Sequence, residues 1–313
     1  MKIIVTAFII WRIIKEHEIV DKLVTIILVN YNGYNDTVHC VKSILKSTYK
    51  NYKIILVDNN SADRDIIRKD SFLLENTDVI FLDENLGFSG GNNRGIDFAK
   101  EKYDPGYYLL LNNDTEIADN AIEELIKTYN RTEHCGLVTG KIFYYDTPDI
   151  IWAAGGKFDF NTGIADQPAL GKKDGDEYSR EKETSFCTGC VMLISKEVLE
   201  TVGKLDEQFF LYAEDTDYCC RVMNKHYKLM YTGNAVIYHK VSASSGRNSE
   251  ATQYYNIRNN FYIIKWYCRN KVYGYLKRWY RITKEIMHGK YEIKVVIRAW
   301  NDFRKGILGK VEI

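Results

Sequence analysis

The sequence has few of the features that mark membrane, secreted or disordered proteins. Only 3 of its 313 residues are proline, and no uninterrupted apolar run approaches the roughly 20 residues that span a bilayer. The 7 cysteines are odd in number and lack the spacing of a disulfide framework, which indicates a reducing compartment. With a net charge of +1 and no nucleic-acid motif, the chain offers no footprint for nucleic acid. We therefore predict a folded cytoplasmic protein.

Two local patterns resemble membrane or redox signals but favour a structural interpretation. Ile3 to Trp11 is apolar but short, and no small-residue cleavage site precedes the first core strand at Leu23. We interpret it as an interfacial or packed helix. Cys187 and Cys190 have the spacing of a redox pair, yet the apolar residues after them predict a buried strand. We expect the cysteines to be structural.

Strands and helices alternate through the first half of the chain. Continuous β-branched and apolar runs predict strands over 23–29, 53–57, 79–82 and 107–111. Helical patterns follow each of them, including one to about Glu75 and one from Asn92 to Lys102. This alternation is typical of an α/β fold with a parallel sheet, in which ligands bind beyond the carboxyl ends of the strands.

Polar residues gather where these strands end. Each loop alone would be unremarkable, but four strand ends that converge on one edge indicate a ligand site. The polar positions are Asn30, Asn32, Asp58, the stretch from Asn85 to Arg94, and the stretch from Asn112 to Asp114.

The second half loses this regular alternation. We expect strands over 137–145 and 186–194, a helix over 196–202, and two short strands over 228–231 and 235–238. The glycine-rich stretches 152–156 and 161–183 predict irregular connections, and 241–249 predicts a flexible loop. From Gln253 onward the pattern is helical. Residues 261–313 hold thirteen Lys and Arg against four Asp and Glu, so this tail is strongly basic.

A cluster of carboxylates lies between Phe210 and Asp217, where Glu214 and Asp215 are adjacent and a third acid follows. Like charges at this spacing repel one another. Either a solvated helix start tolerates them, because the helix dipole favours anions there, or they form a site that binds a cation or moves a proton.

Three further patterns each allow a chemical and a structural interpretation. The segment from Gly87 to Arg94 precedes a helix, so it is either a plain turn or a loop whose backbone amides and arginine bind phosphate; it is neither a Walker loop nor a dinucleotide fingerprint. Asn112 to Asp114 either forms an Asx turn or ligates a divalent cation that also holds phosphate oxygens. His239 is either a core residue or a ligand.

Six motifs together resemble family 2 glycosyltransferases, most closely the bacterial rhamnosyltransferase-like members. The resemblance covers roughly Leu23 to Lys265 and is specific because the motifs keep their order and spacing. They are Val24 to Asn32, Val57 to Ser61, Asn85 to Gly95, Leu110 to Thr115, Gly189 to Leu193, and Phe210 to Asp217.

The resemblance implies a GT-A fold, with a Rossmann-like nucleotide-binding half built on a mostly parallel sheet, a fused acceptor-binding half and C-terminal helices. We place an N-terminal extension at 1–22, the nucleotide-sugar-binding half at 23–116, the acceptor-binding and catalytic half at 117–252, and a basic aromatic tail at 253–313. The implied reaction is inverting transfer of a sugar from a nucleoside diphosphate donor.

The resemblance also implies roles for individual residues. Asp215 matches the catalytic base. Asp114 matches the last acid of the family's metal motif, whose first acid is replaced here by Asn112, and His239 completes a site for Mg²⁺ or Mn²⁺. Asp58 would accept a hydrogen bond from a pyrimidine N–H. Nucleotide-binding positions are Asn30, Tyr31, Asn32, Asp58, Asn85, Gly91, Asn92, Arg94, Asn112 and Asn113. Acceptor or sugar positions are Trp152, Gly189, Glu214, Asp217 and Arg258.

Some of these roles have structural alternatives. Glu214 and Asp217 either orient acceptor hydroxyls or cap the helix, and for Asp217 we favour capping. Arg258 contacts either the diphosphate or a neighbouring acid. Trp152, with the glycine pair Gly155 and Gly156, would line the acceptor or sugar pocket. In the basic tail, aromatic residues interleave with Lys and Arg, which suits either an anionic membrane surface or a packed helical tail with a solvated basic face.

We expect an enzyme that moves a sugar, with rhamnose as one candidate, from a UDP- or dTDP-sugar to a glycan or lipid-linked acceptor in surface polysaccharide synthesis. Its expected place is the cytoplasm, at the inner face of the membrane. The alternatives are a sugar-phosphate nucleotidyltransferase, which lacks here the usual basic glycine-rich loop after the first strand, and a non-catalytic nucleotide-sugar-binding module.

Overall fold

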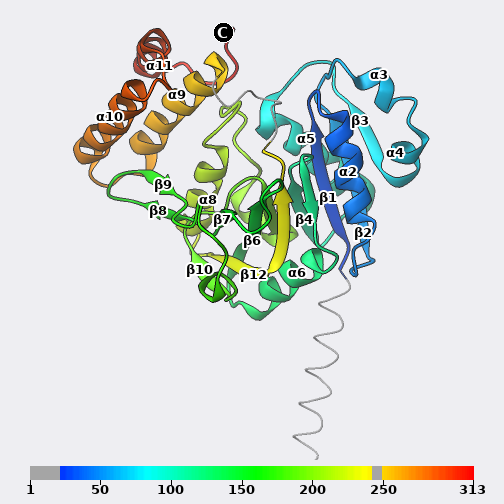
Figure 1. Cartoon of the computed structure of the whole chain (residues 1–313). Coiled ribbons are helices and arrows are strands. Elements are labelled where there is room, and N and C mark those ends of the chain that lie inside the picture. Colours follow the sequence, from blue (N-terminus) through cyan, green and yellow to red (C-terminus); the bar gives the residue numbers. More distant parts are fainter. Residues whose placement is uncertain (1–21, 242–248) are drawn as a thin grey trace, which may run out of the picture.

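The computed structural model describes residues 22–241 and 249–313 (Figure 1). The predictions for Ile3 to Trp11 and for most of the 241–249 loop lie outside the described residues. A single mixed sheet of 10 strands runs through the molecule in the order β10-β12-β6-β11-β4-β1-β2-β3, with β5 paired to β12 and β7 to β6. Its strands are β1 (Val24–Asn30), β2 (Tyr52–Asp58), β3 (Asp78–Phe81), β4 (Tyr107–Leu111), β5 (Thr115–Ile117), β6 (Cys135–Tyr144), β7 (Ile151–Ala154), β10 (Lys182–Thr184), β11 (Val191–Ser195) and β12 (Lys228–His239).

The sheet is parallel across β4, β1, β2 and β3 and becomes mixed beyond β4. Asn30 at the end of β1 pairs in register with Asp58 at the end of β2, so their side chains reach the same edge. Strand β11 runs antiparallel to both β4 and β6, whereas β12 is parallel to β6. The predicted α/β fold with parallel crossovers in its first half is confirmed.

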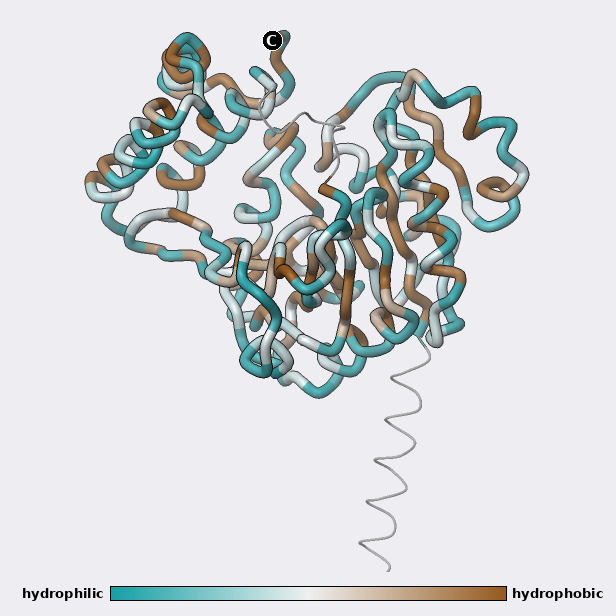
Figure 2. Tube along the Cα trace, in the orientation of Figure 1, coloured by the Kyte–Doolittle hydropathy of each residue, from teal (hydrophilic) through white to brown (hydrophobic). Residues whose placement is uncertain are grey.

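Helices cover both faces of the sheet because successive residues of each buried strand face opposite sides. Val24, Ile26 and Leu28 of β1 pack with α2 and α6, while Ile27 packs with α5 and α8 on the other face. Apolar residues follow the central strands in Figure 2. The helices of these layers are α2 (Tyr34–Ile44), α3 (Arg64–Ile67), α4 (Ser71–Asn76), α5 (Gly87–Tyr103), α6 (Ala121–Arg131), α7 (Lys196–Val202) and α8 (Glu214–Asn224).

The last three helices, α9 (Glu250–Tyr267), α10 (Lys271–Met287) and α11 (Ile293–Lys305), form a separate cluster beside α8 (Figure 1). Phe261 of α9 is fully buried there and contacts Trp279, Trp300 and Phe303 with ring centroids 4.8 to 5.4 Å apart. Much of the aromatic content of the tail therefore forms a core. Among the described helices, none combines the length and the apolar character that a transmembrane segment requires.

Four expectations about local structure are corrected. The glycine-rich segment is not a loop, since α5 begins at Gly87 itself. The helix expected up to Glu75 is two short helices, α3 and α4, because Asp70 caps a new helix by accepting from the Leu73 amide at 3.0 Å. Two strands expected over 228–238 are one strand, β12, whose register shifts between Thr232 and Val236.

The fourth correction concerns residues expected to be irregular, which include most of β7 and the whole of β9 (Ile164–Asp166). Strand β9 forms a hairpin with β8 (Lys157–Asp159). A short 3-10 turn, η1 (Asp176–Tyr178), precedes β10. All seven cysteines are free thiols and buried, as the structural interpretation predicted.

Candidate active site

Two buried side chains organise the edge where β1 and β2 end. Asn30 Nδ2 donates to Asp58 Oδ1 at 3.1 Å, and Asn30 Oδ1 accepts from the backbone N–H of Gly33 at 3.1 Å. Asp58 also accepts from the Ser61 amide at 3.3 Å and lies 3.6 Å from Arg64 Nε. Both side chains are fully buried, so they hold the two loops together. The contact of Asp58 with a pyrimidine N–H stays a prediction.

The residues next to this pair lie nearer the solvent. Tyr31 is 40% exposed and Asn32 is exposed with a left-handed backbone, φ 57°, held by its Oδ1, which accepts from the Ala62 amide at 2.7 Å. Asn113 extends the network from β4, since its amide donates to Asn30 Oδ1 at 3.2 Å and to Thr37 Oγ1 at 2.9 Å. Tyr31 and Asn32 are thus free to face a ligand, whereas Asn113 supports Asn30.

The start of α5 is held by protein groups, which corrects the expected phosphate cradle. The Gly87 amide donates to Asn85 Oδ1 at 2.8 Å and the Phe88 amide to the Phe210 carbonyl at 2.9 Å, so neither N–H is open to phosphate. Asn85 in turn accepts from the Asn59 side chain at 3.1 Å. A Cβ on Gly87, where φ is 72°, would lie 2.0 Å from the Phe210 carbonyl oxygen. Gly87 therefore brings α5 against the segment that precedes α8.

The other predicted residues of α5 divide by burial. A Cβ on Gly91 would lie 2.7 Å from Val29, so this glycine lets the helix pack on β1. Asn92 is 2% exposed and donates to the Phe88 carbonyl at 2.9 Å within the helix. Arg94 is exposed and lies 3.4 Å from Glu207. Of these three residues, Arg94 is the one whose side chain can reach a ligand from the surface.

Asp114 and His239 meet at the end of two paired strands. Asp114 directly precedes β5, and His239 is the last residue of β12, which pairs with β5 through Thr115. His239 Nε2 lies 3.1 Å from Asp114 Oδ1. Trp152 packs edge-on against the imidazole, with ring centroids 4.6 Å apart. Burial lowers the pKa of His239, but Cys190 and Asp114 outweigh burial and raise this pKa to about 10.

This pair can supply two ligands to a divalent cation. A carboxylate oxygen and an imidazole nitrogen face each other, and Mg²⁺ uses one or two carboxylates while substrate phosphates supply further oxygens. His239 must release its proton to ligate a metal, so cation and proton compete for Nε2. Within the described residues, no three His, Cys, Asp or Glu side chains form a metal-binding cluster. A cation here would therefore depend on substrate oxygens.

Asp215 lies in the first turn of α8 and is half-buried. Its Oδ2 accepts from the Gly189 amide at 3.1 Å, and its Oδ1 accepts from the Thr216 amide at 2.7 Å. Burial raises the pKa of Asp215, and the hydrogen bonds from Gly189 and Thr216 act in the opposite direction. A carboxylate whose pKa is raised towards neutrality is a better proton acceptor than an ordinary aspartate.

The two neighbouring acids have different surroundings. Glu214 is 7% exposed, and its Oε2 has no hydrogen-bond partner within the part of the chain that the structure describes. Burial and the charge of Asp215 raise the pKa of Glu214 well above its usual range. Asp217 does not cap the helix: it accepts from Arg221 Nε at 2.8 Å and from the Tyr267 hydroxyl. Asp217 therefore links α8 to α9.

The short segment before β11 brings Asp114 and Asp215 into one neighbourhood. Gly189 donates its amide to Asp215, and the next residue, Cys190, lies beside His239 and within electrostatic range of Asp114. The Cys190 carbonyl also accepts from the Asn112 amide at 2.9 Å. Two acids that are a hundred residues apart in the sequence thus flank two consecutive residues.

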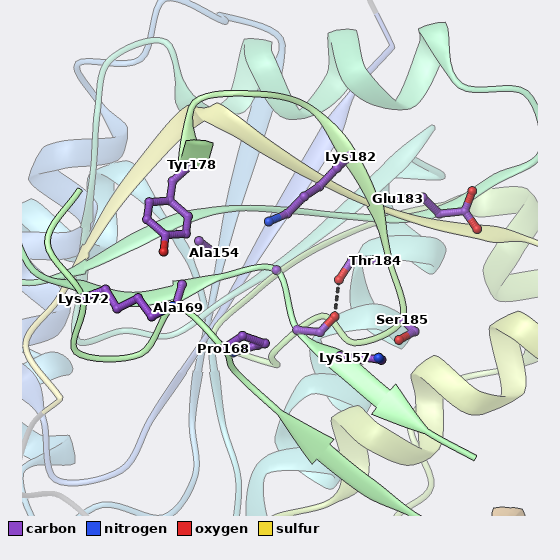
Figure 3. Close-up of a pocket in the computed structure, with 12 residues that line it drawn as sticks. Ala154, Lys157, Pro168, Ala169, Lys172, Tyr178, Lys182, Glu183, Thr184 and Ser185 are labelled. Atoms are coloured by element: carbon purple, nitrogen blue, oxygen red, sulfur yellow. Dashed lines mark hydrogen bonds between the residues drawn. The ribbon is translucent and has the colours of Figure 1, made fainter. Parts of the chain in front are cut away.

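The glycine pair expected to line a sugar pocket does line a cavity of about 590 Å³ (Figure 3). Its walls come from the β7–β8 connection, the η1 segment and β10, and Lys157, Lys172 and Lys182 make it basic. In Figure 3, Lys182 and Tyr178 point into it from the far side. Neither Asp114 nor Asp215 is among its lining residues, and Trp152 packs on His239 instead. The cavity is therefore separate from the paired acids.

Arg258 lies inside the protein, and its hydrogen-bond partners among the described residues include no acid, while its contact with a diphosphate stays a prediction. It is fully buried, its Nε donates to Asn259 Oδ1 at 2.9 Å, and its Nη1 donates to the Gly309 carbonyl at 3.0 Å. The sequence pairs Arg258 with Asn259 in an Arg-Asn element that resembles the family, but it gave Asn259 no role. The side-chain amide of Asn259 donates to the carbonyls of Leu211 and Tyr212 just before α8. Its position next to Arg258 was the feature of the sequence that could have pointed to a role for Asn259.

The architecture defines a class of enzyme. The structure matches a crystal structure of GalNAc-T7 with UDP, GalNAc and Mn2+ at a TM-score of 0.65 and 15% sequence identity, covering 91% of this chain and 58% of that chain. A likeness at this identity concerns the fold, and the predicted GT-A fold is confirmed.

The chain belongs to the glycosyl transferase family 2, whose sequence profile matches residues 25–203. A low-salt glycan biosynthesis hexosyltransferase of Haloferax volcanii is 26% identical over 240 residues, which cover 76% of this chain and 74% of that protein. A dTDP-rhamnosyl transferase of Shigella flexneri is 23% identical over 262 residues, which cover 76% and 79% respectively. The predicted family and the predicted similarity to rhamnosyltransferases are confirmed, and the chain is an enzyme of the glycosyltransferase class.

Proposed function

We propose that this enzyme transfers a sugar with inversion from a nucleoside diphosphate to a hydroxyl group of a glycan or lipid-linked acceptor in cell-surface polysaccharide synthesis. One observation carries the proposal: the two acids lie on either side of two consecutive residues. Gly189 contacts Asp215, and Cys190 lies beside the pair formed by Asp114 and His239. Inversion in one displacement requires a base on the acceptor side and charge neutralisation on the side of the leaving group.

In this reaction Asp215 accepts the proton of the acceptor hydroxyl as its oxygen bonds to the anomeric carbon. The bond from that carbon to the diphosphate breaks, and the diphosphate oxygen takes the electron pair. The Gly189 amide orients Asp215 by its hydrogen bond at 3.1 Å. A divalent cation held by Asp114 and His239 would supply positive charge to the leaving diphosphate. No covalent nucleophile is needed.

The donor that we favour is a UDP- or dTDP-sugar, with dTDP-rhamnose first. The similarity to a dTDP-rhamnosyl transferase supports this choice, and Mn²⁺ in the GalNAc-T7 structure supports a divalent cofactor, Mn²⁺ or Mg²⁺. We assign donor binding to residues 23–116, where Tyr31, Asn32 and Arg94 are exposed. Acceptor binding and catalysis belong to residues 117–252.

We also propose that the enzyme works at the cytoplasmic face of a membrane, bound through α10. One side of this helix carries exposed apolar residues, namely Val272, Leu276, Tyr280 and Met287 at 72%, 64%, 68% and 80% exposure. Lys277 and Lys284 are exposed on the same helix. Apolar side chains bordered by lysines suit an anionic lipid surface, and a lipid-linked acceptor would be delivered there.

The test of the proposed reaction is a donor panel. Purified enzyme is mixed with UDP-, dTDP- and GDP-sugars, with Mg²⁺ or Mn²⁺ or with EDTA, and the released products are separated. We expect nucleoside diphosphate from one donor class, loss of the reaction in EDTA, and a weakened cation response in Asp114→Asn. Pyrophosphate formation from sugar phosphate and nucleoside triphosphate would instead indicate a nucleotidyltransferase, and donor binding without any turnover would indicate a binding module.

A further inference from the structure

The turn that leads into α8 has an unusual backbone. Tyr212 and Ala213 have φ angles of 66° and 73°, so two consecutive residues other than glycine occupy the left-handed region. Residues with a Cβ adopt this conformation only where their surroundings hold them in it. Glu214 begins α8 directly after this turn, so the turn sets the direction in which Asp215 leaves the helix.

Asn259 of α9 stabilises this turn. Its side-chain amide donates to the Leu211 carbonyl at 2.9 Å and to the Tyr212 carbonyl at 2.8 Å, so both N–H groups bind consecutive carbonyls of the turn. The side chain is fully buried, where an unmade hydrogen bond is costly. Arg258 Nε donates to Asn259 Oδ1 at 2.9 Å, which orients the amide with its two donors towards the turn.

The same contacts join the turn to the end of the chain. Arg258 is fully buried and donates from Nη1 to the Gly309 carbonyl at 3.0 Å. The residue after Gly309, Lys310, donates to the Asn85 carbonyl at 3.1 Å beside the start of α5. The turn before Asp215 is thus stabilised by contacts with α9, which lies outside residues 25–203, the segment that the family profile matches.

We propose that Asn259 is a positioning residue, which holds the turn from Leu211 to Ala213 in its left-handed conformation and thereby aims Asp215 at the acceptor hydroxyl. The inference rests on the proposed function of Asp215 as the base. Its chemistry is specific, because an aspartate at this position would place a carboxylate against two carbonyl oxygens, and an alanine would leave both carbonyls without their donor.

The test compares Asn259→Ala with Asn260→Ala. Asn260 is the matched control, because its amide donates to the Asn256 carbonyl at 2.8 Å within α9 and does not reach the turn. We expect Asn259→Ala to lower kcat about a hundredfold, the scale on which a misplacement of about 1 Å acts, with donor affinity unchanged within about twofold. Asn260→Ala should keep kcat near that of the unaltered enzyme.

Two further measurements separate positioning from general stability. Hydrogen exchange should rise in peptides that cover 209–216 in Asn259→Ala and stay unchanged in those that cover 191–195. Adding Ala213→Gly should recover part of the lost kcat, because glycine adopts a positive φ without a steric penalty. If Asn259→Ala does not fold, Asn259→Ser, which keeps one donor, takes its place and should give an intermediate kcat.

A normal kcat in Asn259→Ala or Asn259→Ser would overturn the proposal, and so would a loss of kcat without faster exchange in the turn. If instead the proposed role of Asp215 as the base is wrong, the measurements would give a different result. In that case Asp215→Asn would retain turnover, while the exchange of the turn would still respond to Asn259→Ala.

Discussion

At the scale of single residues, the site contains side chains suited to react with substrate and others that only support the structure. Asp215 is half-buried and bound to the Gly189 amide, whereas Asp58 and Asn30 are fully buried and bind each other. Carboxylates and amides look alike in a sequence, but burial and partners assign them different roles. The carboxylate that retains access to solvent and has a raised pKa is the one suited to exchange a proton.

Asp215→Asn is expected to lower kcat by about 10³-fold, within the usual contribution of general base catalysis, while donor binding stays the same. Asp215 must be ionised to accept a proton, and burial raises its pKa. Activity should therefore fall as pH drops through this raised pKa, at a higher pH than for an ordinary aspartate. Initial rates across pH, with donor titrations, measure both effects.

The matched control is Asp97→Asn on the exposed surface of α5, where the carboxylate pairs with Lys204 at 2.6 Å. It makes the same chemical change far from the acids of the site, so kcat and the pH profile should stay unchanged. Near-normal turnover in Asp215→Asn would exclude this residue as the base.

At the scale of elements, the N-terminal end of α5 is held against the segment that precedes α8. Ser89 in the first turn of α5 donates to the Phe209 carbonyl at 2.8 Å, and the Phe88 amide donates to the Phe210 carbonyl. The glycine-rich segment therefore serves helix packing more than phosphate binding. Its sequence could not show this, because the partner carbonyls lie about 120 residues away.

Gly87→Ala tests this contact between elements. The new Cβ would lie 2.0 Å from the Phe210 carbonyl oxygen, so α5 must shift away from the turn that precedes Asp215. We expect a loss of about 3 kcal/mol or more in the free energy of unfolding, from the left-handed backbone and the overlap together, and a lower kcat. Denaturant unfolding and initial rates are the measurements.

Gly171→Ala separates the two causes. Gly171 has a similar φ of 75°, but no atom lies within 4 Å of an added Cβ. This change should cost only about 1 kcal/mol, the steric penalty of the left-handed conformation, and leave kcat unaltered. Equal losses of stability in the two variants would show that the contact with Phe210 does not matter.

At the scale of the whole molecule, one mixed sheet runs through the described residues, and the helices α9 to α11 form a cluster at its side (Figure 1). Trp279, Trp300 and Phe303 of that cluster pack around Phe261, yet α10 keeps an apolar outer side. The tail is therefore packed on one side, as one of the two interpretations predicted, and presents lysines and apolar groups on the other. Binding of that outer side to a membrane stays a proposal.

The membrane proposal predicts that the paired change Leu276→Glu with Tyr280→Glu reduces binding to vesicles that contain phosphatidylglycerol. Two apolar contacts are lost and two negative charges are added, so binding should fall at least about tenfold. Vesicle flotation measures it, with pure phosphatidylcholine vesicles for comparison and a water-soluble acceptor to verify unchanged catalysis. Leu74→Glu, at a 47% exposed position on α4, is the control. Equal flotation of all variants would contradict the proposal.

Residue patterns alone determined the alternation of strands and helices, the confirmed family, and the strand ends at which polar side chains lie. Local chemistry suffices for these, because burial on both faces imposes apolar runs and the ends of strands need polar loops. Only the tertiary structure decided that the amides at the start of α5 are occupied, that Asp217 pairs with Arg221, and that Asn259 supports the turn before Asp215. Each of these depends on long-range contacts and on which side chain loses access to water, and neither is encoded in local sequence spacing.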